Sequence, residues 1–258
     1  MQNIHFYKYQ GAGNDFVLID NRKGSFDRQN NTLVKAMCDR RFGVGADGLM
    51  LLNASDDYDF EMIYFNADGF EGTMCGNGGR CIVRFAHDLG MIGKSCRFIA
   101  VDGEHLAEVS DADINLKMID IHIIDEYDEG KFFLDTGSPH VVIFVDDIDK
   151  IKIYEEGRNV RYADRFTPDG TNVNFVQIVG DSLKIATYER GVEDETLACG
   201  TGITAAAIAW MYRHDISKQV VNISAKGGNL LVSAEKKDDK YVNVWLKGAA
   251  KRVFSGNF

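Results

Sequence analysis

The stretch Met74-Cys75-Gly76-Asn77-Gly78-Gly79-Arg80 has a counterpart in Ala198-Cys199-Gly200-Thr201-Gly202. In both, a cysteine precedes Gly-x-Gly and an apolar run that predicts a helix. A thiol at a helix N-terminus lies near unpaired backbone N–H groups and the positive end of the helix dipole. This position lowers the pKa of a cysteine from about 8.5 toward neutrality. Two such thiols, one in each half of the chain, indicate a site that uses both.

Cys199 follows Cys75 by 124 residues, and other segments repeat at the same offset. The matching pairs are Gly13–Ile19 with Gly137–Ile143, Tyr64-Phe65-Asn66 with Tyr188-Glu189-Arg190, Ile99 with Ile223, Gly103 with Gly227 and Leu106 with Leu230. The shared register predicts two domains of one fold, residues 1–120 and 121–258, with their boundary between about Met118 and Lys131. The C-terminal strand, at about 250–258, is a candidate to return to the first domain.

The pattern within each half predicts a helix after the cysteine, at Gly79–Leu89 and at Ile203–Tyr212. The second helix is apolar on nearly every face, and a helix of this kind is buried on all sides. We therefore expect an α+β (mixed α/β) fold, with two pseudosymmetric domains and the active site at their interface. In each domain a curved mixed β-sheet wraps around a central helix. Further elements are expected at Phe16–Asp20, Thr32–Arg40 (a helix), Val141–Val145, Val242–Trp245 and Arg252–Phe254.

Composition limits the classes of function. The net charge of −10 over 258 residues argues against sequence-independent binding of nucleic acid, which needs a basic surface. The first ten residues lack the pattern of a secretory signal, and no run of about 18 apolar residues predicts a membrane span. Five cysteines form an odd, sparse set, unlike a disulfide framework. We expect a cytoplasmic protein that acts on a small molecule.

The remaining thiols and one lysine motif predict no further site. Cys38, Cys81 and Cys96 are expected to be small buried hydrophobic residues. There is no Cys-x-x-Cys pair and no histidine cluster with the spacing of metal ligands, so no metal is expected. Gly93-Lys94-Ser95 resembles the end of a phosphate-binding loop, but Asp88 replaces the earlier glycine and the stretch follows a helix.

Two domains placed face to face would bring both cysteines to one cleft. The backbone N–H groups of the two helix ends would then bind a carboxylate, and small residues would let it approach closely: Gly76, Asn77, Gly200 and Thr201. One thiolate would remove the proton on the adjacent carbon, and the other thiol would deliver a proton to the opposite face. The prediction is stereochemical inversion by general acid–base catalysis, with no cofactor.

The chain resembles the diaminopimelate epimerase family from about Phe6 to Phe254. The matching motifs are Gly13–Val17, Arg41–Gly48, Phe65–Gly69, Met74–Gly78, Gly170–Val173, Glu189–Gly191 and Ala198–Gly202. The resemblance implies reversible conversion of LL-2,6-diaminopimelate to the meso form, on the route to lysine and peptidoglycan, without pyridoxal phosphate or metal. It is also compatible with a homodimer.

The resemblance implies a role for individual residues. Cys75 and Cys199 match the catalytic thiols, and Gly76-Asn77 and Gly200-Thr201 match the loops that hold the reacting carboxylate. The positions that hold the substrate's amino and carboxylate groups are matched by Asn14, Asn66, Asn172, Glu189 and Arg190. In the family, a histidine at the position of His140 lies beside the first thiol and a glutamate at that of Glu189 lies near the second. Both are therefore catalytic candidates.

Each of these residues has a structural alternative. Arg190 could be a surface arginine, Glu189 could only pair with it, and His140 could be an exposed loop residue. The three asparagines could simply form turns.

Three departures from the family leave the contacts to the distal end of the substrate open. Ser138 stands where the family often has asparagine, Gly48 stands where some members have glutamine, and the loop Gly191–Thr196 is one residue longer.

Other functions remain as alternatives. A proline racemase or hydroxyproline epimerase would use the same two thiols, but its substrate has no distal amino acid group for Arg190, Asn66 and Asn172 to hold. A non-catalytic binder of anions would not need the thiols. A redox sensor based on a Cys75–Cys199 disulfide would respond to oxidant without turnover.

Overall fold

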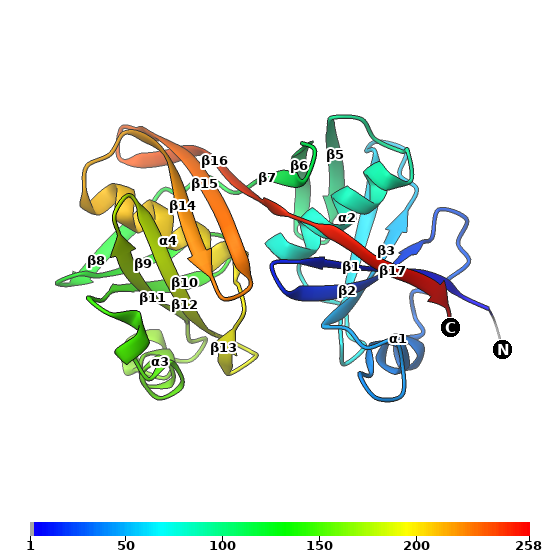
Figure 1. The fold of residues 1–258 in the computed structure, drawn as a ribbon, viewed down its shortest axis with the longest axis horizontal. Helices are drawn as coiled ribbons and strands as arrows, with labels where there is room; N and C mark the ends of the chain where they lie inside the picture. Colours follow the sequence, from blue (N-terminus) through cyan, green and yellow to red (C-terminus); the bar gives the residue numbers. More distant parts are fainter. Residues whose placement is uncertain (1–2) are drawn as a thin grey trace. The chain divides into compact units, whose positions relative to one another are not determined.

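The computed structural model describes residues 3–258, which form two compact units (Figure 1). The first unit contains the chain up to Leu116 together with Gly248–Phe258, and the second contains Lys117–Lys247. The C-terminal segment thus belongs to the unit that holds the N-terminal half. Each unit combines a mixed sheet with helices, which confirms the predicted mixed α/β class.

The first unit has the helices α1 (Asn31–Cys38) and α2 (Gly76–Asp88). In sheet order its strands are β17 (Lys251–Asn257), β1 (His5–Gly11), β2 (Asn14–Asp20), β3 (Gly48–Asn53), β4 (Phe60–Asn66), β5 (Ser95–Ala100), β6 (Gly103–Val109) and β7 (Asp113–Lys117). The pairs β2–β3 and β4–β5 are parallel, and the other neighbours are antiparallel.

The second unit has the helices α3 (Ile153–Arg161) and α4 (Gly200–Arg213) and the short 3₁₀ helices η1 (Ile148–Lys150) and η2 (Asp164–Phe166). Its strands are β8 (Ile124–Asp128), β9 (Lys131–Asp135), β10 (Pro139–Phe144), β11 (Asn172–Val179), β12 (Ser182–Glu189), β13 (Asp194–Thr196), β14 (Lys218–Ala225), β15 (Gly228–Lys237) and β16 (Lys240–Ala249). The parallel pairs are β10–β11 and β12–β14.

Strand register repeats between the two units. In the parallel pair β2–β3, Phe16 lies opposite Gly48, and in β10–β11, His140 lies opposite Asn172. Both residues of the second pair follow those of the first by 124 positions. The two sequences therefore build the same local arrangement, with Gly48 and Asn172 at equivalent places beside the central helices.

Each unit surrounds one helix with its strands (Figure 1). Helix α2 contacts β1, β2, β3, β6 and β17, and every residue from Gly76 to Ala86 is buried. Helix α4 contacts β9, β10, β11, β12, β14 and β15, and its alanine-rich face lets those strands approach closely. The helices begin at Gly76 and Gly200, three residues before the predicted starts, because the glycines directly after each cysteine are already helical.

A second helix covers the outside of each sheet. Helix α1 buries Val34 and Met37 in a cluster with β3 residues, close to its predicted place. Helix α3 was not predicted from the sequence, because it is polar and only Gly157 in it is buried. A Cβ at Gly157 would lie 2.4 Å from the Cβ of Tyr188, so glycine allows α3 to lie directly on β12.

Candidate active site

Cys75 is the N-cap residue of α2. Its backbone is extended (φ −106°, ψ 147°), and its sulfur accepts a hydrogen bond of 3.2 Å from the backbone N–H of Gly78. The side chain is half-buried. Hydrogen bonds to the charged form of an ionisable group favour that form, as does the positive end of a helix dipole. The cap therefore favours a thiolate at this position.

Two of the predicted asparagines adjoin Cys75. The thiol lies 3.9 Å from Oδ1 of Asn14, at the start of β2, and Asn77 donates to the same oxygen at 3.4 Å. Asn77 is buried in the first turn of α2 beside the buried Gly76. The structure thus brings four predicted site residues of the first unit together: Asn14, Cys75, Gly76 and Asn77.

A charged cluster lies behind Asn14 and was not predicted. The Asn14 amide donates to Oδ2 of Asp47 at 2.5 Å, and Arg40 bridges Asp47 and Asp15 at 2.6 and 2.7 Å. Burial alone would raise the pKa of Asp15, but hydrogen bonds from Arg40 and Lys8 outweigh it and lower that pKa to about 2. The Asp15 carboxylate therefore stays charged at neutral pH, and Asp47 fixes the orientation of Asn14.

Asn66 lies in a turn at the end of β4. It ends β4 and is exposed, and its backbone closes a turn through Phe70 and Gly69 at 2.9 and 3.0 Å. The turn that the sequence offered as an alternative is present, and a role of the side chain in binding stays a prediction.

Cys199 is the N-cap residue of α4 and is 9% exposed. Its sulfur lies 3.3 Å from the hydroxyl oxygen of Thr201, which lies 2.9 Å from Nε2 of His140. The backbone carbonyl of Thr201 accepts a hydrogen bond of 2.9 Å from Thr136. The threonine is thereby fixed between the histidine and the sulfur.

His140 is completely buried on β10, so the exposed-loop alternative is wrong. Its Nδ1 lies 3.0 Å from the side-chain amide nitrogen of Asn174, which can only donate, so we assign the ring proton to Nε2. Burial and the charge of Arg190 lower the pKa of His140 to about 3, against the effect of the Asn174 hydrogen bond. The imidazole is therefore neutral at physiological pH. The structure connects it through Thr201 to Cys199, and its expected place beside Cys75 stays a prediction.

The side chain of Asn172 forms hydrogen bonds both with the start of β10 and with the residue that follows β12. Its amide donates to the carbonyl of Pro139 at 3.0 Å, and its Oδ1 accepts the backbone N–H of Arg190 at 2.9 Å. Glu189 accepts a hydrogen bond of 2.9 Å from the hydroxyl of Thr196. The start of β11 and the end of β12 thus hold three predicted residues of the second unit in one hydrogen-bonded region: Asn172, Glu189 and Arg190.

Two of the departures from the family acquire a structural explanation. The hydroxyl of Ser138 lies 3.0 Å from Nε2 of His140 and 3.3 Å from that of Thr201, so it belongs to the Cys199 network. A Cβ at Gly48 would lie 2.5 Å from the Phe65 carbonyl oxygen and from the ring of Tyr64. Tyr64 therefore occupies the space that a longer side chain at position 48 would need.

The other three cysteines have unreactive surroundings. Burial raises the pKa of Cys38 to about 11 and that of Cys96 to about 12, and it raises that of the fully buried Cys81 further. These thiols stay protonated and pack as small apolar groups, as predicted. Among residues 3–258, no group of three or more His, Cys, Asp or Glu side chains is arranged to hold a metal ion. Over the same range, no helix has both the length and the apolar character needed to span a membrane.

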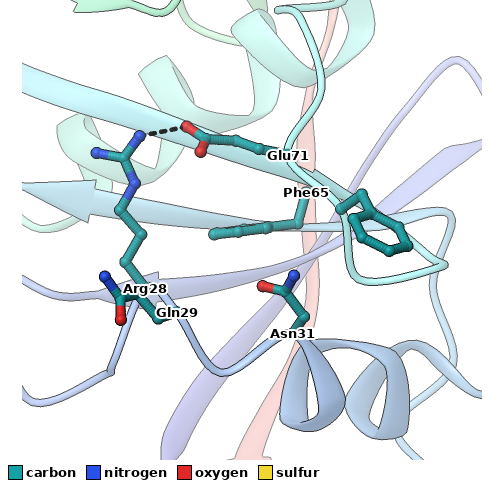
Figure 2. A pocket seen from close by; sticks show the side chains of 6 residues that line it. Arg28, Gln29, Asn31, Phe65 and Glu71 are labelled. Atoms are coloured by element: carbon teal, nitrogen blue, oxygen red, sulfur yellow. Dashed lines mark hydrogen bonds and ion pairs between the residues drawn. The ribbon is translucent and has the colours of Figure 1, made fainter.

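Two surface pockets, one in each unit, are lined by residues other than the predicted ones. Figure 2 shows one in the first unit, across which Arg28 and Glu71 form an ion pair of 2.6 Å. Its other lining residues are Gln29, Asn31, Phe65 and Phe70. A second pocket is lined by residues of β14, β15 and β16. Neither contains a residue of the Cys75 or Cys199 surroundings.

Comparison of the sequence with known proteins identifies its relatives. The family model described as diaminopimelate epimerase matches residues 6–121 and 132–253. The diaminopimelate epimerase of Flavobacterium psychrophilum is 47% identical, over 97% of this chain and 98% of the relative. That of Chlorobaculum tepidum is 46% identical, over 95% and 98%.

Solved structures show the same fold at low sequence identity. A phenazine biosynthesis protein of the PhzF family from Bacillus anthracis superposes with a TM-score of 0.81 at 13% identity, over 100% of this chain and 99% of that one. A hydroxyproline epimerase from Agrobacterium vitis gives a TM-score of 0.70 at 13% identity, over 99% and 92%. Since its family model and its relatives cover nearly the whole sequence, the chain belongs to the diaminopimelate epimerase family.

Proposed function

We propose that this protein catalyses the reversible epimerisation of LL-2,6-diaminopimelate to meso-diaminopimelate. The observation that carries the proposal is the pair of N-cap cysteines, Cys75 on α2 and Cys199 on α4, in a chain of this family. The curated relatives in Flavobacterium psychrophilum and Chlorobaculum tepidum bear the name of this activity. The product is a precursor of lysine and peptidoglycan, which supports a cytoplasmic protein, and a homodimer is part of the same proposal.

The two thiols act as acid and base on one α-carbon. One sulfur, as thiolate, takes the α-proton, and the other, as thiol, gives a proton to the opposite face. The C–H bond that breaks leaves its electron pair on the substrate carbon, and the new C–H bond uses that pair. The carbanion is stabilised by the adjacent carboxylate, which accepts hydrogen bonds from the backbone N–H groups of Gly76-Asn77 and Gly200-Thr201.

The remaining predicted residues bind the substrate. Arg190 is suited to a carboxylate because its guanidinium can donate two parallel hydrogen bonds. The amide side chains of Asn14, Asn66 and Asn172 and the carboxylate of Glu189 supply acceptors for the ammonium groups, and the amides also supply donors. His140 and Glu189 assist proton transfer at the thiols. The anchoring of Asn14 by Asp47 and of Asn172 by Pro139 supports this assignment, since both amides are held in fixed orientations.

Proton NMR in D₂O tests the proposal. The purified reduced protein should exchange the α-proton of LL-diaminopimelate for deuterium and produce the meso isomer without an added cofactor. The Cys75→Ser and Cys199→Ser variants should each lose roughly 10²–10⁴-fold in kcat, because this is the usual contribution of a general acid or base. Cys96→Ser, at a buried thiol outside the site, serves as the control and should retain activity.

The alternatives make different predictions in the same experiment. Exchange of the α-proton of proline or hydroxyproline, with none in diaminopimelate, would show that the proposed substrate is wrong and would leave the two-thiol chemistry in place. Binding of diaminopimelate without exchange would support an anion-binding protein. A response to oxidant without any turnover would support a redox sensor. Full activity in either serine variant would refute the two-base mechanism.

A further inference from the structure

Arg80 is a completely buried cation on the helix that Cys75 caps. Its guanidinium donates to the backbone carbonyl of Gly76 at 3.1 Å and to Oδ1 of Asn77 at 2.8 Å, while its Nε has no hydrogen-bond partner. Within residues 3–258 no carboxylate forms an ion pair with it. A buried charge bound only by neutral acceptors is costly unless an anion is available to it.

The partners of Arg80 lie in the helix turn that carries the thiol. In a helix, long side chains point back toward the N-terminus, so Arg80 reaches the first turn, where Gly76 and Asn77 lie. Asn77 donates to Asn14, and Asn14 is the acceptor near the sulfur of Cys75. The guanidinium therefore acts on the site both through its charge and through the position of the Asn77 amide.

The anions that could compensate this charge are few. The groups whose negative charge acts on Arg80 are Cys75, Cys81 and Asp113. Cys81 is fully buried, its pKa is raised, and it stays a neutral thiol. Asp113, the first residue of β7, is partly solvated, which weakens its effect. This leaves the sulfur of Cys75 as the anion that benefits most from Arg80.

The carboxylates near the site already have counter-ions. Asp15 on β2 and Asp47 beyond Asn14 are paired with Arg40, and Asp15 is paired with Lys8 as well. Arg84 lies one turn further along α2, away from the thiol, and donates to the backbone carbonyls of Ser110 and Asp113. The cation in the turn next to the thiol that has no carboxylate partner is therefore Arg80.

In the second unit, the position equivalent to Arg80 carries no charge. The residue 124 positions after Arg80 is Thr204, and its hydroxyl donates to the carbonyl of Gly200 at 3.0 Å. Arg80 and Thr204 thus bind the same carbonyl of their helices, but only Arg80 carries a charge. In that unit the cation whose charge acts on His140, next to Thr201 and Cys199, is Arg190.

We propose that Arg80 is a positioning residue that favours the thiolate form of Cys75 in the resting protein. The thiolate is the form in which Cys75 can take a proton from the substrate. The consequence for turnover rests on the proposed function, but the effect of Arg80 on the thiol can be measured without any substrate.

Alkylation by iodoacetamide tests the proposal, because only the thiolate reacts. Each thiol is followed by peptide mass spectrometry over a range of pH in a protein in which the other is serine, which removes coupling between their titrations. The reaction midpoint of Cys75 should lie at least one pH unit below the value of about 8.5 for an unperturbed thiol. A midpoint at or above about 8.5 would overturn the proposal even without an arginine variant.

Variants at position 80 test whether Arg80 lowers the alkylation midpoint of Cys75. Arg80→Met keeps the length and removes the charge, and it should raise the Cys75 midpoint by at least one pH unit and leave the Cys199 midpoint unchanged. Arg80→Lys should restore part of the shift, since it keeps the charge but loses the fork that binds Gly76 and Asn77. Arg84→Met, on the same helix, should leave both midpoints in place. An unmoved Cys75 midpoint in a folded Arg80→Met protein would refute the role of Arg80.

The result is independent of the enzyme assay. If the Cys75 midpoint is low and depends on Arg80 while diaminopimelate does not exchange, the proposed function fails and the assignment of Arg80 stands. If diaminopimelate is epimerised and the Cys75 midpoint does not depend on Arg80, the assignment of Arg80 fails alone.

Discussion

Nε2 of His140 lies 2.9 Å from the hydroxyl oxygen of Thr201, and that oxygen lies 3.3 Å from the sulfur of Cys199. Asn174 fixes the other ring nitrogen and is itself fixed by a hydrogen bond of 2.9 Å from Thr187. A hydroxyl can donate and accept at once, so Thr201 can form hydrogen bonds with the imidazole and with the thiol at the same time. The three groups form a short line of hydrogen bonds that ends at the N-terminus of α4.

The Thr201→Val variant should lose these hydrogen bonds, and the Thr201→Ser variant should keep them. Valine has the shape of threonine without the hydroxyl, so we expect kcat to fall roughly tenfold to a hundredfold, the range in which one hydrogen bond to a reacting group acts. The alkylation midpoint of Cys199 should shift in the valine variant, and that of Cys75 should not. Equal kcat values in the valine and serine variants would exclude the hydroxyl from catalysis.

His140→Gln should change how stability depends on pH. The pKa of His140 is about 3 in the folded protein and about 6.5 in an unfolded chain, so protons bind preferentially to the unfolded state between these values. The parent protein therefore loses up to about 1.4 kcal/mol of unfolding free energy per pH unit as pH falls below 6.5. Urea unfolding of parent and variant at pH 4.5 and 7 gives the comparison. The parent's advantage over the variant should shrink at the lower pH, and a constant difference would contradict a buried neutral ring.

Asp47→Ala should weaken substrate binding in the proposed reaction. Asp47 holds the amide of Asn14, and loss of a hydrogen bond to a charged group costs about 1.5–3 kcal/mol. We expect KM for diaminopimelate to rise roughly tenfold or more, since Asn14 loses its fixed orientation. Asp20→Ala is the matched control, because Asp20 lies at the other end of β2 in a separate ion pair with Arg22. A similar KM in both variants would show that Asn14 does not take part in substrate binding.

Gly202→Ala should disturb both stability and turnover. A Cβ at this position would lie 2.3 Å from Oδ1 of Asn174 and 3.3 Å from the ring of His140. Such overpacking costs about 1–3 kcal/mol, equivalent to a decrease of several degrees in the midpoint of thermal unfolding. Gly93→Ala, where a Cβ meets no atom within 4 Å, is the control. Identical midpoints and kcat values for the two variants would show that Asn174 does not orient the histidine.

The central helices could be anticipated from sequence because their signals are local. Cys-Gly-x-Gly followed by apolar residues marks α2 and α4, and their N-cap thiols follow from the same few positions. The shared offset likewise matches the observed registers of β2–β3 and β10–β11. The proximity of Asn14 to Cys75 agrees with the family motifs, while the catalytic roles of both residues stay predictions.

The supporting polar residues could not be anticipated, because their signals are not local. Lys8, Arg40 and Asp47 are joined only by strand pairing and the end of α1, and no periodicity relates their positions. Asn174 lies within a strand that reads as apolar, and its function depends on a partner 34 residues away. Arg80 likewise has the pattern of a surface residue on an amphipathic helix, and its burial follows only from the strands that pack around α2.

The pairing of β17 with β1 has a consequence for biosynthesis. Ile4 and Phe258 exchange backbone hydrogen bonds of 3.1 and 2.9 Å, so β17, which is translated after every other strand of both units, completes the sheet begun by β1. The segment Lys117–Lys247, in contrast, is continuous in sequence. During synthesis on the ribosome, this segment can fold before β17 has emerged. The unit that contains β1 cannot complete its sheet until then, so the unit whose synthesis begins second can finish folding first.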